Sequence, residues 1–382
     1  MKILHLINDH QVIERTLGVY EELFPQQNEV LLFVEKKEPK HLNKYASSKR
    51  VTSRNIRQIA ESIDFSDITY VIAHYMTMDK IDFIKYIPKN IHVCWEVYGY
   101  DLYNQFLEPN GYKIAYTDST PYLRKSVALI KHFRLLFNLC LIIKGYKYPF
   151  KWQKNKQFRY IANRIDSIQY CCRYDAVFIE NFAQRQIPSY EVFNYSLTEV
   201  LGDLKDSPFT KGKHILVGNS ASFSNNHLYV LEYLNKIELS SDIKLIMPLS
   251  YGGTPKYVND VEKQFRDVFP SRVRTLREYM PLHEYNKMFL DVNSCIMSAW
   301  RQESIGTIIM CLYLGIKVFM SNRSPLYKWL EECGFKLFEL ESATHESLES
   351  PLDDDIRLFN RHLVLERYSE EKVADNFRKN IC

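Results

Sequence analysis

Small and polar residues follow an apolar run in the second half of the chain, where they could bind an anion. The run His214–Val217 is predicted to be a strand, and a helix is expected to begin shortly after it. Small residues let the main chain approach a ligand closely, and the unpaired N–H groups of a helix start favour negative charge. The candidate diphosphate-binding residues are Gly218, Asn219, Ser220, Ser222 and Asn226. The alternative is that they only form the turn and cap the helix.

Two more turns of this kind follow later predicted strands. The first has the sequence PLSYGG and supplies Ser250, Tyr251 and Gly252. The second has the sequence SAWRQESIGTI and supplies Arg301, Gln302, Glu303, Ser304 and Gly306. A guanidinium neutralises phosphate well, whereas the amide and carboxylate suit ribose or sugar hydroxyls. Three such turns together predict a nucleotide diphosphate site, and without the Lys-Ser/Thr of a P-loop they do not imply nucleotide hydrolysis.

Candidate acid–base groups follow strands predicted in the first half. A glycosyl acceptor hydroxyl loses a proton during transfer, and a carboxylate or a histidine can accept it. The candidates by residue type are His10, Glu96 and Asp101. For each of them a capping or salt-bridge role is the alternative. We find no cluster of His, Asp and Glu with the spacing of a metal site, so we expect neither metal nor cofactor besides the donor substrate.

The elements that must position these residues alternate between short apolar runs and helical patterns. Strands are predicted at Lys2–Ile7, Glu29–Glu35, Tyr70–His74, His92–Glu96, Asp175–Glu180, His214–Val217, Ile243–Pro248, Arg272–Leu276, Ser294–Met297, Lys317–Met320 and Lys336–Glu339. Helices are predicted at Ile13–Leu23, Arg54–Ile63, Lys80–Tyr86, Leu228–Lys236, Lys256–Val268, Leu282–Phe289, Ile305–Leu314 and Pro325–Cys333. Such alternation predicts the α/β class with parallel sheets, which bind ligands beyond the carboxyl ends of their strands.

The length of 382 residues favours two domains. We expect two Rossmann-like domains facing a central cleft, the first over residues 1–190 and the second, which holds the donor, over 210–350. The polar, proline-containing segment Gln186–Lys213 is the expected connector. The last residues, 351–382, are predicted to form helices that cross back to the first domain.

A basic, aromatic segment interrupts this alternation between residues 111 and 164. It holds twelve Lys and Arg against one acid, Asp118, so its net charge is +11 while the whole chain carries +4. Cations beside Trp, Phe and Leu at helical spacing are typical of a helix that lies on an anionic membrane surface. We favour this interpretation of the insertion over a helical hairpin packed on the first domain, and over nucleic acid binding, for which no recognition motif is present.

Composition and the chain's first residues bear on its location. Apolar residues make up 46% and charged residues 25%, which is typical of a globular protein. The eight cysteines form no C-x-x-C pair, which favours reduced thiols in a reducing compartment. The sequence MKILHLINDH leads straight into a predicted strand, so we expect no secretion signal, and no apolar run is long enough to span a membrane. We therefore expect a cytoplasmic protein at the inner face of the inner membrane.

Four features of the second half are similar to one known family. They are the strand followed by VGNSASFSNNH, the PLSYGG turn, the RQESIGTI helix start and the strand-turn KVFMSNRSPLY, with weaker support from Trp95–Tyr103. Together they resemble the 4-α-L-fucosyltransferases of glycosyltransferase family 56, which are TDP-4-acetamido-4,6-dideoxygalactose:lipid II transferases. The resemblance implies a GT-B fold, a nucleotide-activated deoxyamino sugar donor and a polyprenyl-diphosphate-linked acceptor. It also implies donor-site roles for Gly218, Asn219, Ser220, Asn226, Arg301, Gln302 and Gly306.

The expected function is transfer of a fucose-like deoxyamino hexose from a nucleotide diphosphate sugar, dTDP-linked by the resemblance, to a lipid-linked or saccharide acceptor. Two alternatives stay open from the sequence. One is a GT-B transferase that uses a GDP- or UDP-sugar in capsule or lipopolysaccharide synthesis. The other is a non-catalytic, glycan-binding scaffold protein.

Overall fold

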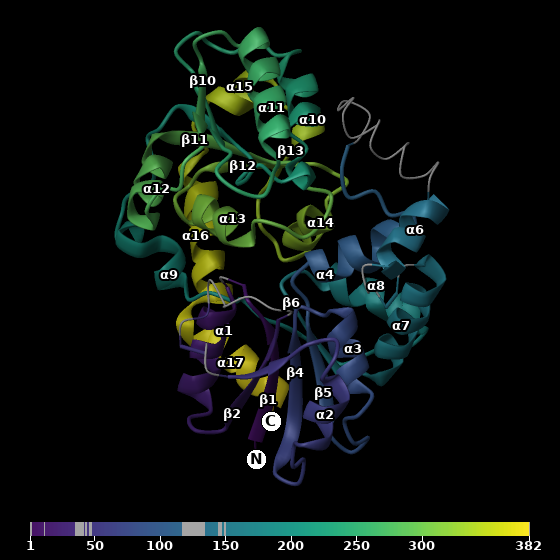
Figure 1. Cartoon of the computed structure of the whole chain (residues 1–382). Coiled ribbons are helices and arrows are strands. Elements are labelled where there is room, and N and C mark those ends of the chain that lie inside the picture. Colours follow the sequence, from purple (N-terminus) through teal and green to yellow (C-terminus); the bar gives the residue numbers. More distant parts are fainter. Residues whose placement is uncertain are drawn as a thin grey trace. The chain divides into compact units, whose positions relative to one another are not determined.

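The computed structural model describes residues 2–10, 12–34, 42, 44–45, 48–116, 134–143, 147–148 and 150–381. These residues form two compact units (Figure 1). The first unit contains the chain up to Tyr112, the segment His132–Tyr195 and the C-terminal Glu371–Cys382, and the second contains Ser196–Glu370 together with Lys113–Lys131.

The first unit is built on a parallel sheet of seven strands in the order β3-β2-β1-β4-β5-β6-β7. The strands are β1 (Lys2–Asn8), β2 (Asn28–Phe33), β3 (Lys49–Val51), β4 (Ile68–His74), β5 (His92–Glu96), β6 (Ser167–Tyr170) and β7 (Ser189–Glu191). The helices are α1 (Ile13–Leu23), α2 (Ile56–Glu61), α3 (Met78–Ile84), α4 (Tyr100–Leu102), α6 (Arg134–Ile143), α7 (Lys151–Arg164), α8 (Arg173–Ala183) and α17 (Glu370–Ile381). Because strand order reverses between β1 and β4, residues after these two strands lie at the switch point of the sheet.

The second unit is built on a parallel sheet of six strands in the order β10-β9-β8-β11-β12-β13. The strands are β8 (His214–Val217), β9 (Leu245–Pro248), β10 (Val273–Leu276), β11 (Val292–Met297), β12 (Lys317–Met320) and β13 (Phe338–Glu339). The helices are α9 (Leu197–Leu201), α10 (His227–Leu234), α11 (Pro255–Val268), α12 (Leu282–Met288), α13 (Ile305–Tyr313), α14 (Pro325–Glu332), α15 (His345–Glu349) and α16 (Asp354–Tyr368). The switch point of this sheet lies between β8 and β11.

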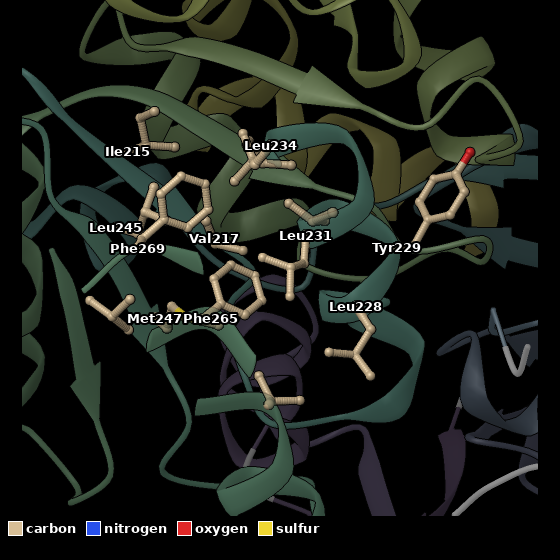
Figure 2. Close-up of a cluster of buried hydrophobic side chains, with 14 of the residues drawn as sticks. Ile215, Val217, Leu228, Tyr229, Leu231, Leu234, Leu245, Met247, Phe265 and Phe269 are labelled. Atoms are coloured by element: carbon tan, nitrogen blue, oxygen red, sulfur yellow. The ribbon is translucent and has the colours of Figure 1, made fainter. Parts of the chain in front are cut away.

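One face of the second sheet carries the hydrophobic cluster shown in Figure 2. Leu231 of α10 and Phe265 of α11 pack there with Val217 of β8 and Met247 of β9. Each of these apolar side chains is at most 8% exposed. Burial of this kind stabilises a fold by roughly 25 cal/mol per Å² of apolar surface, so the cluster holds β8 and β9 firmly beneath the turns that follow them.

The last helix, α17, belongs to the first unit, whereas α16 belongs to the second. Phe377 of α17 is fully buried, and its ring meets that of Tyr20 edge to face at 5.0 Å. The Tyr70 hydroxyl of β4 donates a 2.7 Å hydrogen bond to the main-chain oxygen of Asn380. These contacts fasten the C-terminus of the chain to the first sheet.

The prediction of two doubly wound parallel sheets is confirmed, and one strand within it is wrong. Asp175–Glu180 lies in helix α8, whose buried residues Asp175, Ala176 and Ile179 follow helical spacing. The strand that the sheet uses instead is β6, all four residues of which are buried. The predicted insertion, 111–164, is also divided: α6 and α7 belong to the first unit, but Tyr116 donates its main-chain N–H to Asn226 within the second.

Candidate functional site

The three turns predicted to bind a diphosphate follow adjacent strands of the second sheet. They come after β8, β9 and β11, which are neighbours in the strand order. Because all three strands are parallel, their carboxyl ends lie at the same edge. The sequence-predicted residues of these turns are therefore brought to one side of the sheet, next to its switch point.

The turns after β8 and β9 touch through their main chains. The Ala221 N–H donates to the Tyr251 oxygen at 2.7 Å. A Cβ atom at Gly253 would lie only 2.3 Å from the Ala221 oxygen, and one at Gly252 would lie 3.2 Å from the Ser222 nitrogen. Gly252 also has a φ of +87°, which side chains other than glycine rarely adopt. Glycine is thus required here because two main chains approach each other closely.

The turns after β8 and β11 meet at Glu303. One oxygen of this carboxylate accepts from the Ser224 hydroxyl and from Arg301 Nε, the latter at 3.1 Å. The other oxygen lies 3.5 Å from Asn225 Nδ2. Arg301 and Glu303 form an ion pair with side chains only 10% and 13% exposed. Glu303, predicted to bind hydroxyls, therefore holds the Arg301 side chain in place.

Asn225 orders the turn that begins at Gly218. Its Oδ1 accepts from the Asn219 N–H at 3.2 Å, and its Nδ2 donates to Ser220 Oγ at 3.1 Å. Gly218 has a φ of +70°, and a Cβ atom there would lie 2.9 Å from Asn225 Oδ1 and 3.0 Å from His227 Nε2. This compact turn exists because glycine leaves room for two side chains.

Several buried polar atoms at this edge have no hydrogen-bond partner. They are Asn219 Oδ1, Ser298 Oγ and His227 Nε2. The other nitrogen of His227, Nδ1, lies 3.0 Å from the Tyr257 hydroxyl, and burial lowers the pKa of this histidine to about 4. An unpaired buried polar group costs about 1–3 kcal/mol, so such atoms gathered at one edge suggest that a ligand completes the site.

The remaining predicted donor residues occupy the same turns with different exposure. Asn226 is buried, and both ends of its amide are used: Oδ1 accepts from the Tyr116 N–H at 2.7 Å and Nδ2 donates to the Ser298 oxygen at 2.8 Å. Gln302 is 8% exposed, whereas Tyr251 is 55% exposed. The others are Ser222, bonded to Ser224 at 2.7 Å, exposed Ser250, Ser304 at the start of α13 with a φ of +66°, and Gly306 in its first turn.

The candidate acid–base residues lie at the carboxyl edge of the first sheet. His10, which follows β1, is exposed. Its ring lies 6.4 Å from that of Tyr75, nearly parallel to it, and 6.4 Å from that of Tyr98, edge to face. Tyr75 follows β4, so His10 and Tyr75 flank the switch point between β1 and β4.

Glu96 ends β5 and is fully buried. One of its oxygens lies 2.7 Å from His74 Nδ1, and the other accepts from Asn194 Nδ2 at 2.9 Å. His74 Nε2 lies 2.8 Å from His5 Nδ1, and His5 Nε2 lies 2.9 Å from Asn28 Oδ1. We call these five residues, Asn28, His5, His74, Glu96 and Asn194, the buried histidine chain.

Hydrogen-bond chemistry fixes the protons of the buried histidine chain. Asn28 Nδ2 donates to the main-chain oxygens of Tyr20 and Phe24, so its Oδ1 must accept from His5 Nε2–H. Burial lowers the pKa of His5 to about 3, so His5 is neutral and its Nδ1 accepts from His74 Nε2–H. One proton then remains, between His74 Nδ1 and Glu96. Both oxygens of Glu96 thus face groups of the protein itself, His74 and Asn194.

Asp101 is also fully buried, at the start of α4. One oxygen accepts from the Met76 N–H at 2.9 Å and from Trp95 Nε1 at 2.8 Å, and the other accepts from the Tyr98 N–H at 3.0 Å. Burial raises the pKa of Asp101, while these donors act in the opposite direction. Asp101 therefore supports the main chain of the sheet edge, whereas Glu96 contacts the side chains of His74 and Asn194. Of the three candidates only His10 is exposed.

A family model described as "4-alpha-L-fucosyltransferase glycosyl transferase group 56" matches residues 144–350, more than half of the chain. The chain belongs to this family. It is therefore a glycosyltransferase with a fucosyltransferase family domain, and the family resemblance predicted from the turn motifs is confirmed.

Solved structures that resemble this family member show its fold. HepE of Anabaena, solved in complex with UDP, superimposes with a TM-score of 0.66 at 11% identity over 100% of this chain and 99% of HepE. Sucrose-phosphate synthase of Thermosynechococcus elongatus gives 0.64 at 10% identity, over 100% and 98%. The lipopolysaccharide outer core galactosyltransferase WaaB gives 0.60 at 10% identity, over 100% and 99%. These neighbours establish the GT-B fold, as predicted.

Three structural observations complete the description of this glycosyltransferase. No group of three or more His, Cys, Asp or Glu residues able to hold a metal occurs in the described part of the chain. Within the same ranges, no helix has the length and apolar character needed to cross a membrane. The seven cysteines that the structure describes form no disulfide bond with one another.

Sequence reasoning left several contributing residues of this family member out of the site. Asn225 lies 3.5 Å from Glu303 but stands in the sequence as an ordinary turn residue. His5 lies within the apolar run KILHLIN, and a histidine in an otherwise buried strand is the signal that could have indicated a buried polar chain. Nothing local marks Asn194, because its partner Glu96 is 98 positions away in sequence.

Proposed function

We propose that this enzyme transfers a fucose-like deoxyamino hexose from a dTDP-sugar to a lipid-linked saccharide acceptor at the inner face of the bacterial inner membrane, as a step in surface polysaccharide synthesis. The observation that carries the donor side of the proposal is the joining of three turns at one sheet edge, where Arg301 is held by Glu303 beside unpaired buried polar atoms. The dTDP moiety rests on the resemblance of those turns to family 56.

In this proposal the turn Gly218–Ser222 and Arg301 hold the donor diphosphate. Transfer breaks the bond between the sugar anomeric carbon and the diphosphate oxygen, and negative charge grows on that oxygen. Main-chain N–H groups and one guanidinium stabilise such charge without rearrangement at the moment of reaction. No metal ion or cofactor takes part, since these groups of the chain itself compensate the charge.

The acceptor hydroxyl forms the new bond to the anomeric carbon and loses its proton to a base. We propose His10 as that base because it is exposed at the switch point of the first sheet, whereas Glu96 and Asp101 are fully buried. The nearly parallel Tyr75 ring supports the orientation of the imidazole. His10→Gln should therefore lower kcat by about 10²–10⁴ with little change in donor KM.

A panel of dTDP-, UDP- and GDP-sugars tests the proposal directly. With a polyprenyl-diphosphate-linked saccharide as acceptor, we expect release of dTDP and a product larger by one hexose. Turnover with only UDP- or GDP-sugars would support glycosyl transfer but contradict the proposed dTDP-linked donor. Glycan binding with no nucleotide sugar consumed would contradict the proposed reaction.

A further inference from the structure

Helix α6 turns apolar side chains outward. Leu136 is 58% exposed, Leu139 45% and Ile143 85%, while the polar Asn138 is only 8% exposed. Spacings of three and four residues place the three apolar side chains on one face of the helix. Ile142, beside that face, is 47% exposed. A helix at a water-exposed surface has the opposite arrangement, so this face is suited to an apolar environment.

Helix α7 adds an exposed tryptophan and a basic face. Trp152 is 66% exposed, and Lys156, Arg159 and Asn163 follow on the same face at helical spacing, all exposed. The opposite face, with Phe158, is buried in the first unit. A shallow hollow of about 410 Å³ lies on the exposed face, lined by Lys156, Arg159, Tyr160, Asn163 and Arg164.

Two residues between α6 and α7 contact helix α3 of the first unit. Lys147 and the Tyr148 hydroxyl both bind the carboxylate of Asp82 in α3, which Lys85 binds as well. Burial alone would raise the pKa of Asp82, but these hydrogen bonds lower it, so the carboxylate remains charged. Lys147 and Tyr148, which lie in sequence between the helices α6 and α7 labelled in Figure 1, thus bind to α3.

Charge identifies the partner of this surface. Residues 134–164 contain eight Lys and Arg and no Asp or Glu. A second copy of the chain would bring the same cations face to face, and like charges oppose association. An anionic lipid bilayer has an apolar interior, which can bury the leucines and isoleucine of α6. Its negatively charged headgroups attract the cations of α7.

We propose that the exposed apolar face of α6, with Trp152 and the basic face of α7, forms a lipid-binding surface that docks the enzyme on an anionic bilayer. Leu136, Leu139 and Ile143 enter the acyl boundary, Trp152 lies at headgroup level, and the basic hollow takes an anionic headgroup. The inference rests on the proposed function in one respect: a lipid-linked acceptor makes such docking useful, because it brings the enzyme to the membrane that contains the substrate.

Flotation of the full-length enzyme with vesicles tests the surface. Wild-type protein should float with vesicles of phosphatidylcholine and phosphatidylglycerol, and less with phosphatidylcholine alone. The variant Leu136→Asp/Ile143→Asp should lower the vesicle-bound to free ratio at least about tenfold, since charges replace side chains that enter lipid. The matched control is Leu358→Asp/Phe359→Asp, which changes residues of α16 with 59% and 47% exposure and should float like wild type.

The basic face has its own variant and control. Lys156→Glu/Arg159→Glu should abolish the preference for phosphatidylglycerol, whereas Lys263→Glu/Arg274→Glu, an equal change of charge in the second unit, should retain it. Equal flotation of the α6 variant and the α16 control would overturn the proposal. So would conversion of a dimer to a monomer by the α6 variant with unchanged flotation, measured by sedimentation velocity, because the face would then bind a second copy.

The same preparations separate this inference from the proposed function. Thermal shift with dTDP reports the donor site and should be unchanged in the α6 variant, which also shows that this variant is folded. Normal flotation without any response to dTDP would contradict the proposed donor and support the lipid-binding surface. A dTDP response without flotation would support the proposed donor and contradict the lipid-binding surface.

Discussion

The carboxyl edges of the two sheets are built from different chemistry. At the edge of the second sheet, glycines let two turns touch, and polar atoms such as Asn219 Oδ1 have no partner. At the edge of the first sheet, Glu96 and Asp101 are fully buried, and each carboxylate accepts hydrogen bonds from neighbouring groups of the chain. The difference teaches that buried carboxylates can build a scaffold, whereas small residues that let two turns approach each other closely indicate the place for a ligand.

The largest effect should come from breaking the buried histidine chain at Glu96. Glu96→Ala leaves His74 Nδ1 and Asn194 Nδ2 buried without a partner, and should cost about 3–5 kcal/mol of unfolding free energy. Glu96→Gln should cost about 1 kcal/mol or less, because its amide can donate to neutral His74 and accept from Asn194. Urea unfolding of both variants measures this difference.

The Gln variant also sharpens the comparison of the two edges. If Glu96 is scaffold, Glu96→Gln keeps transfer activity near that of wild type, whereas loss of a base would lower it about 10²–10⁴-fold. Equal destabilisation by Gln and Ala would contradict the proton arrangement that we derive for the chain.

Arg301→Ala should have the next largest effect, on catalysis. The Arg301 guanidinium is a preorganised hydrogen-bond donor that stabilises negative charge on the leaving diphosphate. Removal of one such donor lowers kcat/KM by about 10²–10³. Arg274→Ala, which removes an exposed guanidinium from strand β10 of the same unit, is the control and should retain wild-type kinetics. Steady-state turnover with the preferred nucleotide sugar provides the measurement, and unimpaired turnover of Arg301→Ala would remove this residue from the donor site.

Gly253→Ala should separate the turns after β8 and β9. The added Cβ would meet the Ala221 oxygen at 2.3 Å and the Ala221 Cβ at 2.8 Å, so the two main chains must move apart. Displacement of a binding turn by about an ångström lowers kcat/KM by ~10-fold to 10²-fold. The control is Gly18→Ala in α1, where a Cβ meets nothing within 4 Å; it should leave transfer unchanged and raise stability by about 0.4–1 kcal/mol.

A pH dependence of stability is expected in the first unit. Asp175 is fully buried, accepts from the Tyr103 hydroxyl at 2.7 Å, and burial raises its pKa to about 8 from a normal value of 3.8. Folding therefore favours the protonated form of Asp175. The stabilisation that protonated Asp175 gives to the folded protein is complete below about pH 4 and is lost as pH rises to about 8. The variant Asp175→Asn should not lose this stability, because asparagine stays uncharged over the whole pH range.

Stability of Asp175→Asn relative to wild type should thus increase by up to about 1.4 kcal/mol per pH unit across this window. Urea unfolding of both proteins at a series of pH values measures the slope. A difference that does not change with pH would show that Asp175 is not held protonated.

Hydrophobic periodicity sufficed to predict most of the fold, although it missed the short strands β3, β6 and β7. Its one wrongly assigned strand has a physical origin. Ile13–Leu23 and His214–Val217 coincide with α1 and β8, because long amphipathic helices and isolated apolar runs carry clear periods. The apolar run within Asp175–Glu180 is too short to distinguish a buried strand from a buried helix. Only the contacts of α8 with β6 and α7 decide that it is helical.

The candidate donor turns could be predicted because their chemistry is local. Glycine and serine after a strand predict a turn, and the structure has a turn at each of these places. The three turns share one sheet edge. The burial of Glu96 could not be predicted, since its partners His74 and Asn194 come from distant positions of the chain. Residue type alone gave three candidate bases; exposure, which is a tertiary property, distinguishes His10 from the other two.

A crystal structure of the enzyme with dTDP tests the central claim most directly. We predict that the diphosphate lies at the carboxyl edge of β8, β9 and β11, within hydrogen-bond distance of main-chain N–H groups of the Gly218–Ser222 turn and of the Arg301 guanidinium. A diphosphate bound elsewhere, with these turns and Arg301 unengaged, would contradict the account.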